Sequence, residues 1–442
     1  MSHLDNRLDG LLELRKAKGR FRKLREYDTS RGSGLTDFSS NDYLSLTTSE
    51  ELRADYLKRL NDTDVILGST GSRLLSGCTP AHSHLENRLC EHFGAPAALL
   101  FNSGWDANVS FFGFVPQPGD WVVFDELVHA SVHSGMRGSR VPTSRRLQFA
   151  HNDPESLAAV LRKIAAQPSS SAAPPTIFLA LEALYSMDGD FAPIPTLLDV
   201  FDQHVSREQQ CVIVDEAHTT GVYGSQGRGI VHQLKEGAGR DDGRVTVRLM
   251  TFGKGVGCSG SVLLASETVR SFLINFARPF IFSTALPVST VLALESAWDL
   301  LSSDAGKRKR DDLASIVSYF QELLAPVLER TPPELLRLPD PTPTPFPAAP
   351  AGLGSHPHSP IHGLLSPTPH ALSAFLLNRG FIVRPVVPPT VPPGGERVRV
   401  CLRAGHSREE IKALVSAVAE WVDSGAAEAE AAKAGRPLRA RL

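Results

Sequence analysis

Lys254 and Asp215 are the two residues whose surroundings most directly indicate chemistry. Lys254 lies in TFGKGVGCSG (251–260), where it follows an apolar run and stands among glycines. Asp215 follows the apolar run CVIV, so we expect it at the carboxyl end of a strand, where open parallel sheets hold their ligands. A lysine can form a Schiff base with an aldehyde, and a carboxylate can pair with a protonated pyridine nitrogen. The pair therefore indicates a pyridoxal phosphate site, although each residue alone is more often a loop lysine or a helix cap.

Two other interpretations of the glycine-rich stretch fit less well. Gly255, Gly257 and Gly260 match the dinucleotide-binding pattern G-x-G-x-x-G, but SVLLAS, which follows, is typical of a strand rather than a helix. No acidic residue lies about 20 positions further on, where a ribose partner is needed. A phosphate-binding Walker loop requires Ser or Thr after the lysine, and Gly255 stands there instead.

Three further features could complete such a site. Gly104 and Trp105 follow the apolar run LLF and open a helical pattern, and free N–H groups at a helix start suit a phosphate. His129 follows the strand-like WVVF and offers a ring that could lie on the cofactor. His218, three residues after Asp215, could reach an oxygen of the same ligand. Each has a plain alternative: an ordinary strand-to-helix turn, a surface loop histidine and a core histidine.

The elements that must position these residues are typical of an α/β protein. Short apolar runs alternate with helical patterns such as 154–166, which predicts parallel strands covered on both faces. The predicted strands are WVVF (121–124), TIFLALE (176–182), CVIVDE (211–216), RVTVRLMTF (244–252) and SVLLAS (261–266). A long helical pattern over about 288–328, then FIVRPVV, RVRVCL and a helix from SREEIKALVSAVAEWV, predict a smaller α+β domain.

Composition limits the class of protein. The chain has 442 residues, 42% of them hydrophobic and 21% charged, as in ordinary globular proteins. A net charge of −2 argues against a nucleic-acid partner, and no long uncharged apolar run predicts a membrane span. Five scattered cysteines without a C-x-x-C pattern indicate reduced thiols inside the cell. A small-molecule substrate is therefore expected, and no metal site is predicted, because the histidines at 356, 358 and 362 lie in a proline-rich stretch without a fourth ligand.

Serial motifs give the chain a family resemblance. FSSNDYLSL (38–46), GSTGSRLLSG (68–77), HASVHSG (129–135), EALYSMDGD (182–190), DEAHTTGVYG (215–224), TFGKGVGCSG and PPTVPPG (388–394) resemble, in order, the motifs of the α-oxoamine synthases. These enzymes condense an amino acid with an acyl-CoA and lose carbon dioxide. The resemblance covers about 8–422 and implies a fold-type I PLP-dependent transferase, whose large domain holds a mostly parallel, seven-stranded sheet. Among members, the chain is most similar to those that join L-alanine to pimeloyl-CoA.

The resemblance also implies roles for individual residues. Lys254 would bind pyridoxal 5′-phosphate and remove the α-proton, Asp215 would keep the pyridinium protonated, and His129 would stack on the ring. The other expected cofactor contacts are Gly104, Trp105, Ser186, His218, Thr251 and, toward a partner subunit, Thr284. Arg399 would pair with the amino-acid carboxylate, while Arg22, expected on the N-terminal helix, and Thr390 would contact the acyl substrate. A homodimer with shared active sites is implied.

The expected domain organisation follows from the same comparison. We predict an N-terminal helix and segment that packs on the small domain or on a dimer partner (1–55), a large PLP-binding domain (56–290), a C-terminal small domain (291–424) with a Pro-rich surface excursion (331–363), and a mobile tail (425–442). The last three residues, Ala440, Arg441 and Leu442, have the form of a peroxisomal address. Without that address, we expect a cytoplasmic protein.

Two departures leave the acyl substrate open. Val387 stands where members specific for pimeloyl-CoA usually carry arginine, although Arg384 is close by, and the Pro-rich excursion is absent from compact bacterial members. An aminolevulinate, glycine acetyl-transferring or sphingoid-base synthase stays an alternative. So does a partner subunit that has lost its chemistry, although retention of Lys254, Asp215 and His129 argues against it.

Overall fold

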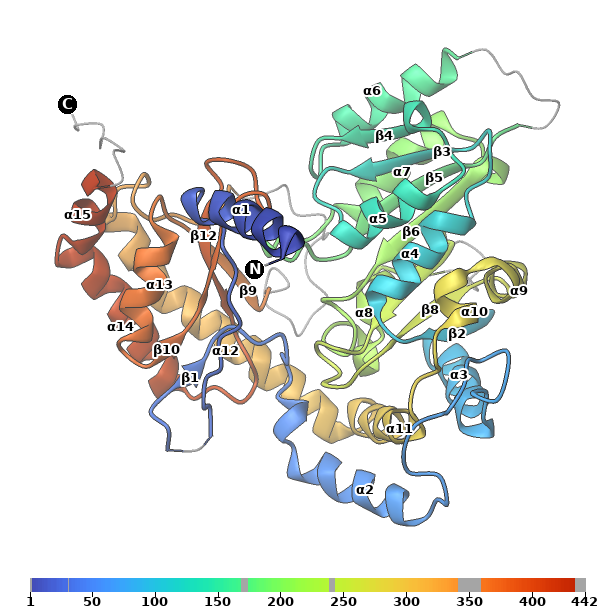
Figure 1. Cartoon of the computed structure of the whole chain (residues 1–442), viewed down its shortest axis with the longest axis horizontal. Coiled ribbons are helices and arrows are strands. Elements are labelled where there is room, and N and C mark those ends of the chain that lie inside the picture. The colour runs from blue at the N-terminus through green and yellow to red at the C-terminus, as the bar shows by residue number, and fades with distance from the viewer. Residues whose placement is uncertain (1, 31, 168–173, 238–242, 341–358, 434–442) are drawn as a thin grey trace.

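The computed structural model describes residues 2–30, 32–167, 174–237, 243–340 and 359–433. A large domain is built around a seven-stranded sheet of strand order β2-β8-β7-β6-β5-β3-β4 (Figure 1). Its strands are β2 (Ala97–Phe101), β3 (Trp121–Asp125), β4 (Arg146–Phe149), β5 (Ile177–Glu182), β6 (Gln210–Asp215), β7 (Val247–Thr251) and β8 (Ser261–Ala265). The five strands from β7 to β4 run parallel, whereas β8 is antiparallel to both of its neighbours. The expected mostly parallel sheet is therefore confirmed, with β8 as the reversed strand.

The sheet is buried on both faces, which explains why its strands lack an apolar and polar alternation. Successive residues of one strand fall into two different apolar cores: Leu179 and Leu181 of β5 lie in one, and Phe178 and Ala180 lie in the other. The covering helices are α3 (Pro80–Phe93), α4 (Gly104–Phe114), α5 (Ala130–Gly138), α6 (Pro154–Ala165), α7 (Ile194–His204), α8 (Gly229–Gln233), α9 (Glu267–Phe276) and α10 (Arg278–Phe282). Burial on two faces leaves the sheet edge at the carboxyl ends of the parallel strands as the place for polar side chains.

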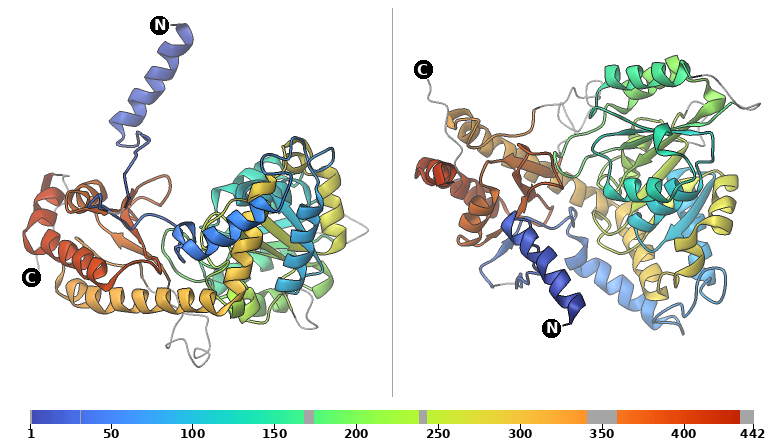
Figure 2. Two further views of the ribbon diagram at one scale, coloured as in Figure 1. Left: turned by 90° about the horizontal axis from the view of Figure 1, so that it is seen from below. Right: turned by 45° about the horizontal axis from the view of Figure 1, so that its top comes forward.

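Two helices connect the domains. The predicted helical pattern over 288–328 forms α11 (Val288–Ser302) and α12 (Asp304–Arg330) rather than one helix. Ser303 separates them, because its hydroxyl accepts hydrogen bonds from the N–H groups of Ala305 and Gly306 and so caps α12. α12 runs from beneath the large domain into the small one, and α2 (Glu50–Asn61) lies beside α11 (Figures 1 and 2).

The small domain has an antiparallel sheet of order β11-β12-β9. Its elements are β9 (Ile361–Leu365), α13 (Pro369–Leu377), β10 (Phe381–Ile382), β11 (Arg384–Val386), β12 (Arg397–Cys401), α14 (Arg408–Asp423) and α15 (Ala426–Lys433). The N-terminal segment joins this domain through β1 (Thr36–Asp37), which pairs with β10. The expected α+β character of the C-terminal region is thus present.

The N-terminal helix differs from its expected form. α1 (His3–Ala17) buries none of its residues, and it projects away from the rest of the chain (Figure 2). The helix ends before Arg22, because Gly19 adopts a left-handed conformation with φ of 63°. Arg22 therefore lies in the irregular segment after α1, and its expected place on the helix was wrong.

Two other boundaries need correction. The excursion predicted over 331–363 ends earlier, because Ile361 begins the buried strand β9, and Leu335 and Leu336 are also buried. His362 lies within β9 against Phe320. The tail predicted from 425 begins as helix α15, whose Ala427 and Ala431 are buried.

The histidines at 356 and 358 and the predicted address at 440–442 lie outside the described residues. No helix in the described ranges is long and apolar enough to cross a membrane.

Candidate active site

Most of the predicted residues of the site gather where the central parallel strands end. Asp215 is the last residue of β6 and Thr251 is the last of β7. Lys254 stands in the turn that follows β7, and the turn after β6 carries His218. The adjacent carboxyl ends of β6 and β7 therefore bring a carboxylate, a hydroxyl, an amine and an imidazole to one sheet edge.

Lys254 is paired with His218. Its Nζ lies 2.8 Å from His218 Nε2, and His218 Nδ1 lies 2.6 Å from the hydroxyl of Tyr43. Burial lowers the pKa of Lys254, while the charge of Asp215 opposes this shift. Burial, followed by the charge of Lys254, lowers the pKa of His218 well below its usual value. The imidazole is therefore neutral, and the amine is shifted toward the uncharged form that attacks an aldehyde.

Asp215 is held by a hydrogen-bonded chain that reaches His129. Its Oδ2 accepts a hydrogen bond of 2.8 Å from Asn108 Nδ2, and its Oδ1 accepts one from the N–H of Ala217. Asn108 Nδ2 also donates to Ser131 Oγ at 3.0 Å, and Ser131 Oγ lies 2.7 Å from His129 Nδ1. The carboxylate, 8% exposed, is thus oriented by neutral donors and has no cationic partner among the described salt bridges. It is placed to receive a cation from a ligand.

Glu182 is a neighbour of Asp215 that the sequence analysis missed. The two residues are paired in the register of β5 and β6, so their side chains lie on the same face of the sheet. Burial, followed by the charge of Asp215, raises the pKa of Glu182 well above its ordinary value. Glu182 is therefore shifted toward its neutral, protonated form.

Gly104 and Thr251 form a cradle suited to a phosphate. Gly104 opens α4, and Ser103 caps that helix by accepting a hydrogen bond from the N–H of Asp106. A Cβ built on Gly104 would stand only 2.3 Å from Thr251 Oγ1, so the absence of a side chain is required for this close approach. Trp105 meets His129 edge to face, with the ring centroids 5.9 Å apart. The N-terminus of α4 therefore lies next to the Thr251 hydroxyl and close to the rings of Trp105 and His129.

Arg399 occupies the small-domain side of the site. Its Nε donates to the backbone oxygen of Ser186 at 2.7 Å, and its Nη2 donates to Asn41 Oδ1 at 3.0 Å. None of the ion pairs found in the described ranges includes Arg399, although it is only 9% exposed. A buried guanidinium without a carboxylate suits the α-carboxylate of an amino acid. Asn41, which lies 358 positions away in sequence, was not predicted.

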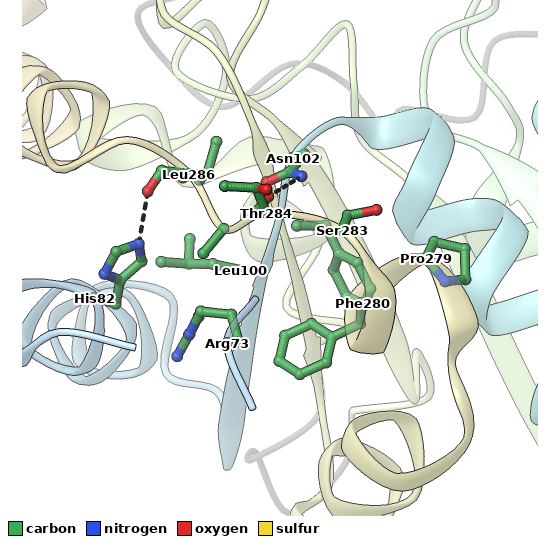
Figure 3. Close-up of a pocket in the computed structure, with 11 residues that line it drawn as sticks. Arg73, His82, Leu100, Asn102, Pro279, Phe280, Ser283, Thr284 and Leu286 are labelled. Atoms are coloured by element: carbon green, nitrogen blue, oxygen red, sulfur yellow. Dashed lines mark hydrogen bonds between the residues drawn. The ribbon is translucent and has the colours of Figure 1, made fainter. Parts of the chain in front are cut away.

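Three predicted residues are not brought to Lys254 within one chain. Arg22 and Thr390 are exposed, and Thr284 is also exposed, in a pocket lined by the end of β2 (Figure 3). Arg73, His82, Asn102 and Phe280 line that pocket together with Leu100, Phe101, Pro279, Ser283, Thr284, Ala285 and Leu286. Asn102 Nδ2 donates to the backbone oxygen of Thr284 at 2.8 Å, so Thr284 is tied to the strand that leads into the phosphate cradle.

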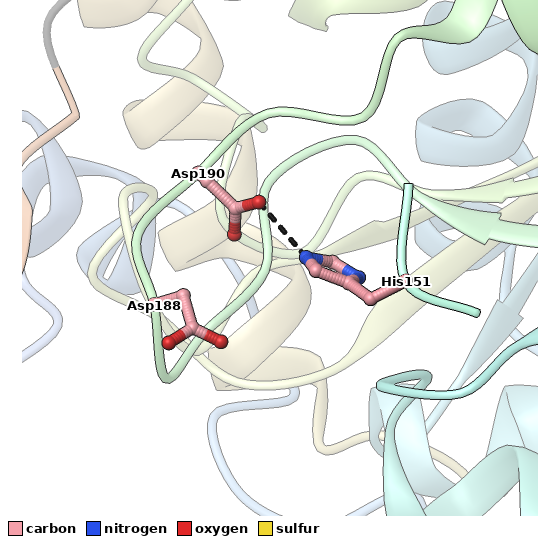
Figure 4. A group of neighbouring side chains, drawn as sticks. All are labelled: His151, Asp188 and Asp190. Carbon is pink, nitrogen blue, oxygen red and sulfur yellow. Dashed lines mark hydrogen bonds and ion pairs between the residues drawn. The ribbon is translucent and has the colours of Figure 1, made fainter. Parts of the chain in front are cut away.

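A separate cluster of polar side chains stabilises the loop that carries Ser186. His151, Asp188 and Asp190 converge there, as Figure 4 shows. His151 Nδ1 lies 2.9 Å from Asp125 Oδ1, and its Nε2 lies 2.8 Å from Asp190 Oδ2. Burial opposes the charged form, but these two carboxylates prevail and raise the pKa of His151 to about 10. Asp188 pairs with Arg397 of β12. The group is therefore an ion-pair network in which the histidine is protonated, not a free set of metal ligands.

Comparison with known proteins places this site in a family. Residues 33–418 match the model for aminotransferases of class I and II. The chain is 39% identical over 393 residues to an 8-amino-7-oxononanoate synthase of Emericella nidulans, covering 88% of this chain and 90% of that one. It is 31% identical to an aminoacyl transferase sphA of Aspergillus fumigatus, covering 88% and 81% of the two chains.

Solved structures share the fold. A serine palmitoyltransferase from S. paucimobilis with bound PLP superposes with a TM-score of 0.77 at 22% identity, covering 97% of this chain and all of that one. An 8-amino-7-oxononanoate synthase from Francisella tularensis gives a TM-score of 0.65 at 21% identity, covering 89% and 99%. The chain belongs to the aminotransferase class I and II family, with the fold-type I architecture. Within it, the chain is an α-oxoamine synthase, a PLP-dependent acyltransferase similar to 8-amino-7-oxononanoate synthase.

Pyridoxal 5′-phosphate, the cofactor of this class, fits the residues that are present. Lys254 supplies an amine shifted toward its neutral form, and Asp215 supplies a carboxylate without a cation. Gly104 and Thr251 leave room at a helix N-terminus for the phosphate. His129, joined to Asp215 through Ser131 and Asn108, supplies a ring that would adjoin the pyridine.

Proposed function

We propose that this enzyme condenses L-alanine with pimeloyl-CoA to give 8-amino-7-oxononanoate, CoA and carbon dioxide, a step of biotin biosynthesis. The observation that carries the proposal is the complete set of Lys254, Asp215, His129 and Arg399 in a chain 39% identical, over most of both lengths, to a protein of that name. In the reaction, the α-carbon of alanine forms a bond to the acyl carbon, the CoA thiolate leaves, and the carboxylate departs as carbon dioxide.

The chain's own residues account for binding and proton transfer. Arg399 binds and orients the alanine carboxylate, and Asn41 and Ser186 fix its guanidinium from two sides. Lys254 accepts the α-proton at Nζ, and a proton returns to the same carbon after carbon dioxide leaves; neutral His218 holds the amine in place. Asp215 would hold a proton at the pyridine nitrogen of the bound cofactor. When bound, pyridoxal phosphate supplies an electron sink for the negative charge left on the α-carbon.

A second candidate is an α-oxoamine synthase that uses glycine or serine with a different acyl-CoA. The relatives named aminoacyl transferase sphA and the structural similarity to serine palmitoyltransferase support this alternative. Both candidates use the same lysine, aspartate and arginine, so they differ in substrate and not in the type of reaction. A non-catalytic partner subunit is disfavoured by the paired Lys254 and His218.

A spectral titration separates these possibilities. The purified protein is loaded with pyridoxal phosphate, and the cofactor's absorption is followed as L-alanine, glycine and L-serine are added, each with and without pimeloyl-CoA. The proposal predicts that L-alanine changes the spectrum at the lowest concentration and that pimeloyl-CoA alters it further only with L-alanine. A response to serine or glycine alone would indicate a different amino-acid substrate for an enzyme of the same family. No cofactor absorption at all would support a non-catalytic subunit.

We further propose a homodimer with shared active sites. Apolar side chains that globular proteins normally bury are exposed in α1, in the loops that lead to the pocket of Thr284 and at the end of α10. They are Leu4, Leu8, Leu11, Leu12, Leu14, Val65, Ile66, Leu67, Leu74, Leu75 and Phe282. A second copy covering this surface would bring Thr284 toward the partner's phosphate cradle. Light scattering of the protein as it elutes from a size-exclusion column should give twice the mass of the chain. A fully active monomer would contradict the proposal.

We also propose peroxisomal import through Ala440, Arg441 and Leu442, because these residues have the form of the S-K-L type of address. A fluorescent protein ending in the last ten residues should collect in peroxisomes. The control is the same reporter with Leu442→Asp. If both reporters were diffuse in the cell, the proposal would be contradicted.

A further inference from the structure

Arg384 and Arg399 stand side by side on the small-domain sheet. β11 and β12 run antiparallel, and their register pairs Arg384 directly with Arg399. Residues paired in this way have side chains on the same face of a sheet, with Cβ atoms about 5 Å apart. Arg399 directs its guanidinium toward Ser186 and Asn41 at the candidate active site. The side chain of Arg384 therefore leaves the same face of the sheet, from the neighbouring edge strand β11.

The two arginines differ from the third arginine of this sheet. Arg397, two residues before Arg399 and on the same face, is neutralised by Asp188. Within the described ranges, the ion pairs include neither Arg384 nor Arg399. We assign Arg399 to binding the carboxylate of the amino-acid substrate. Arg384 remains as a second cation on this face without an anionic partner.

Aromatic packing holds Arg384 in position. Its guanidinium carbon lies 5.3 Å from the ring centroid of Tyr27, in the segment that follows α1. Stacking on an aromatic face orients the planar guanidinium and leaves its N–H groups free for a carboxylate. Arg384 is exposed in the single chain, so water and a ligand can both reach it.

Arg384 is the only basic residue of 381–396, where the chain reads FIVRPVVPPTVPPGGE. Arg25, whose Nη1 lies 3.5 Å from the Tyr27 hydroxyl, is a second cation beside the same ring. This stretch includes Thr390, which we expect beside the acyl chain. An aliphatic acyl chain would find apolar residues here, and the guanidinium would face whatever ends that chain.

We propose that Arg384 binds the terminal carboxylate of a dicarboxylic acyl group and so sets the acyl specificity of the enzyme. This inference rests on the proposed condensation with pimeloyl-CoA, whose acyl group ends in a carboxylate. Arg399 and Arg384 then bind the two carboxylates that enter with the two substrates, one each. A fatty-acyl substrate has no carboxylate at that end and gains nothing from Arg384, so this residue separates the proposed reaction from the sphingoid-type alternative.

The test compares pimeloyl-CoA with heptanoyl-CoA, which has the same chain length and lacks the carboxylate. Steady-state kinetics with L-alanine are measured for the wild type, Arg384→Gln and Arg384→Lys, each loaded with pyridoxal phosphate. We expect Arg384→Gln to lower kcat/KM for pimeloyl-CoA by roughly 10- to 100-fold, mainly through KM, which is the range expected for a hydrogen bond to a charged group. Heptanoyl-CoA turnover and the KM for L-alanine should be unchanged, and Arg384→Lys should keep part of the preference.

A matched control exists in the same domain. Arg408, at the start of α14, also stacks on a tyrosine, with its guanidinium carbon 4.7 Å from the ring centroid of Tyr319. Arg408→Gln removes an equivalent contact and should leave both acyl-CoA esters unaffected. Arg22→Gln should lower turnover of both esters alike, because neither the CoA part nor the inner acyl chain differs between them.

The outcomes separate this inference from the function on which it rests. A wild type that makes product from pimeloyl-CoA but turns over heptanoyl-CoA equally well would overturn the role of Arg384 and keep the proposed function. An Arg384→Gln variant that keeps the wild-type preference would do the same. A wild type that accepts no pimeloyl-CoA and prefers a fatty acyl-CoA would overturn both.

Discussion

Lys254 Nζ lies 2.8 Å from His218 Nε2, and the same imidazole lies 2.6 Å from the Tyr43 hydroxyl through its other nitrogen. His218 is thus held from both sides, and it fixes the amine to which we assign proton transfer in the proposed reaction. Burial lowers the pKa of both groups, so the contact joins an amine shifted toward its neutral form to a neutral imidazole and not two cations.

Replacing Lys254 by alanine should remove the covalent attachment of pyridoxal phosphate. The loaded protein is reduced with borohydride and digested, and the peptides are analysed by mass spectrometry. The wild type should carry the cofactor on the peptide with Lys254, and the variant on none. Lys163→Ala, at an exposed position of α6, should label as the wild type does. Labelling of another lysine in the wild type would refute the assignment.

Asn108 should matter through Asp215, which it orients by a hydrogen bond of 2.8 Å. In Asn108→Ala, a buried carboxylate loses one of its donors, a loss of about 1.5–3 kcal/mol for a hydrogen bond to a charged group. We expect the affinity for pyridoxal phosphate to fall by roughly 10- to 100-fold, measured by fluorescence quenching. Asn275→Ala, on the exposed side of α9, is the control. Unchanged affinity in Asn108→Ala would show that Asp215 needs no such support.

Gly104→Ala should damage the phosphate cradle. The new Cβ would meet Thr251 Oγ1 at 2.3 Å, which requires the Thr251 hydroxyl to rotate away or the start of α4 or the end of β7 to move. We expect weaker binding of pyridoxal phosphate, and the double variant Gly104→Ala with Thr251→Ser should not restore it because the hydroxyl remains. Gly138→Ala, where a Cβ meets nothing within 4 Å, should bind as the wild type does. Equal affinities for both alanine variants would exclude the cradle.

His151 should make stability depend on pH. Its pKa of about 10 in the folded protein lies above the ordinary value near 6.5, so its contribution is complete below about pH 6.5 and is lost as pH rises through 10. The free energy of unfolding in urea should therefore fall between pH 7 and pH 9.5 in the wild type, by a few kcal/mol at most. His151→Gln should be less stable at pH 7 and show a flatter dependence.

An exposed histidine provides the control for that experiment. His84, whose side chain is 73% exposed, faces Glu295, so His84→Gln should change the pH dependence little. If His151→Gln kept the wild-type slope, the buried network of His151, Asp125 and Asp190 would not be the cause.

Most of the strands and the central residues of the site could be predicted because they depend on short stretches of sequence. An apolar run followed by Asp215, or by the turn with Lys254, places a polar group at a strand end. A strand followed by Ser103 and Gly104 predicts a helix start in the same way. Strand direction is not encoded locally, which is why the reversal of β8 was not foreseen.

The residues that sequence analysis missed reach the site through tertiary packing. Asn41 is brought to Arg399 by the pairing of the N-terminal segment with the small domain, and Asn108 reaches Asp215 from the next layer of helices. Asn108 stands in α4 together with the polar residues Asp106 and Ser110, so the sequence did not single it out. Arg22 was placed on a helix because the leucine spacing was followed past Gly19, whose left-handed conformation ends the helix.

The most direct measurement of the central claim is identification of the product. Purified enzyme with pyridoxal phosphate is given an equimolar mixture of L-alanine, glycine and L-serine with pimeloyl-CoA, succinyl-CoA and palmitoyl-CoA, and the amino ketones formed are quantified by mass spectrometry. The structure and its relatives lead us to expect 8-amino-7-oxononanoate as the main product, with none in Lys254→Ala. A main product built from serine and palmitoyl-CoA, or from glycine and succinyl-CoA, would contradict the account.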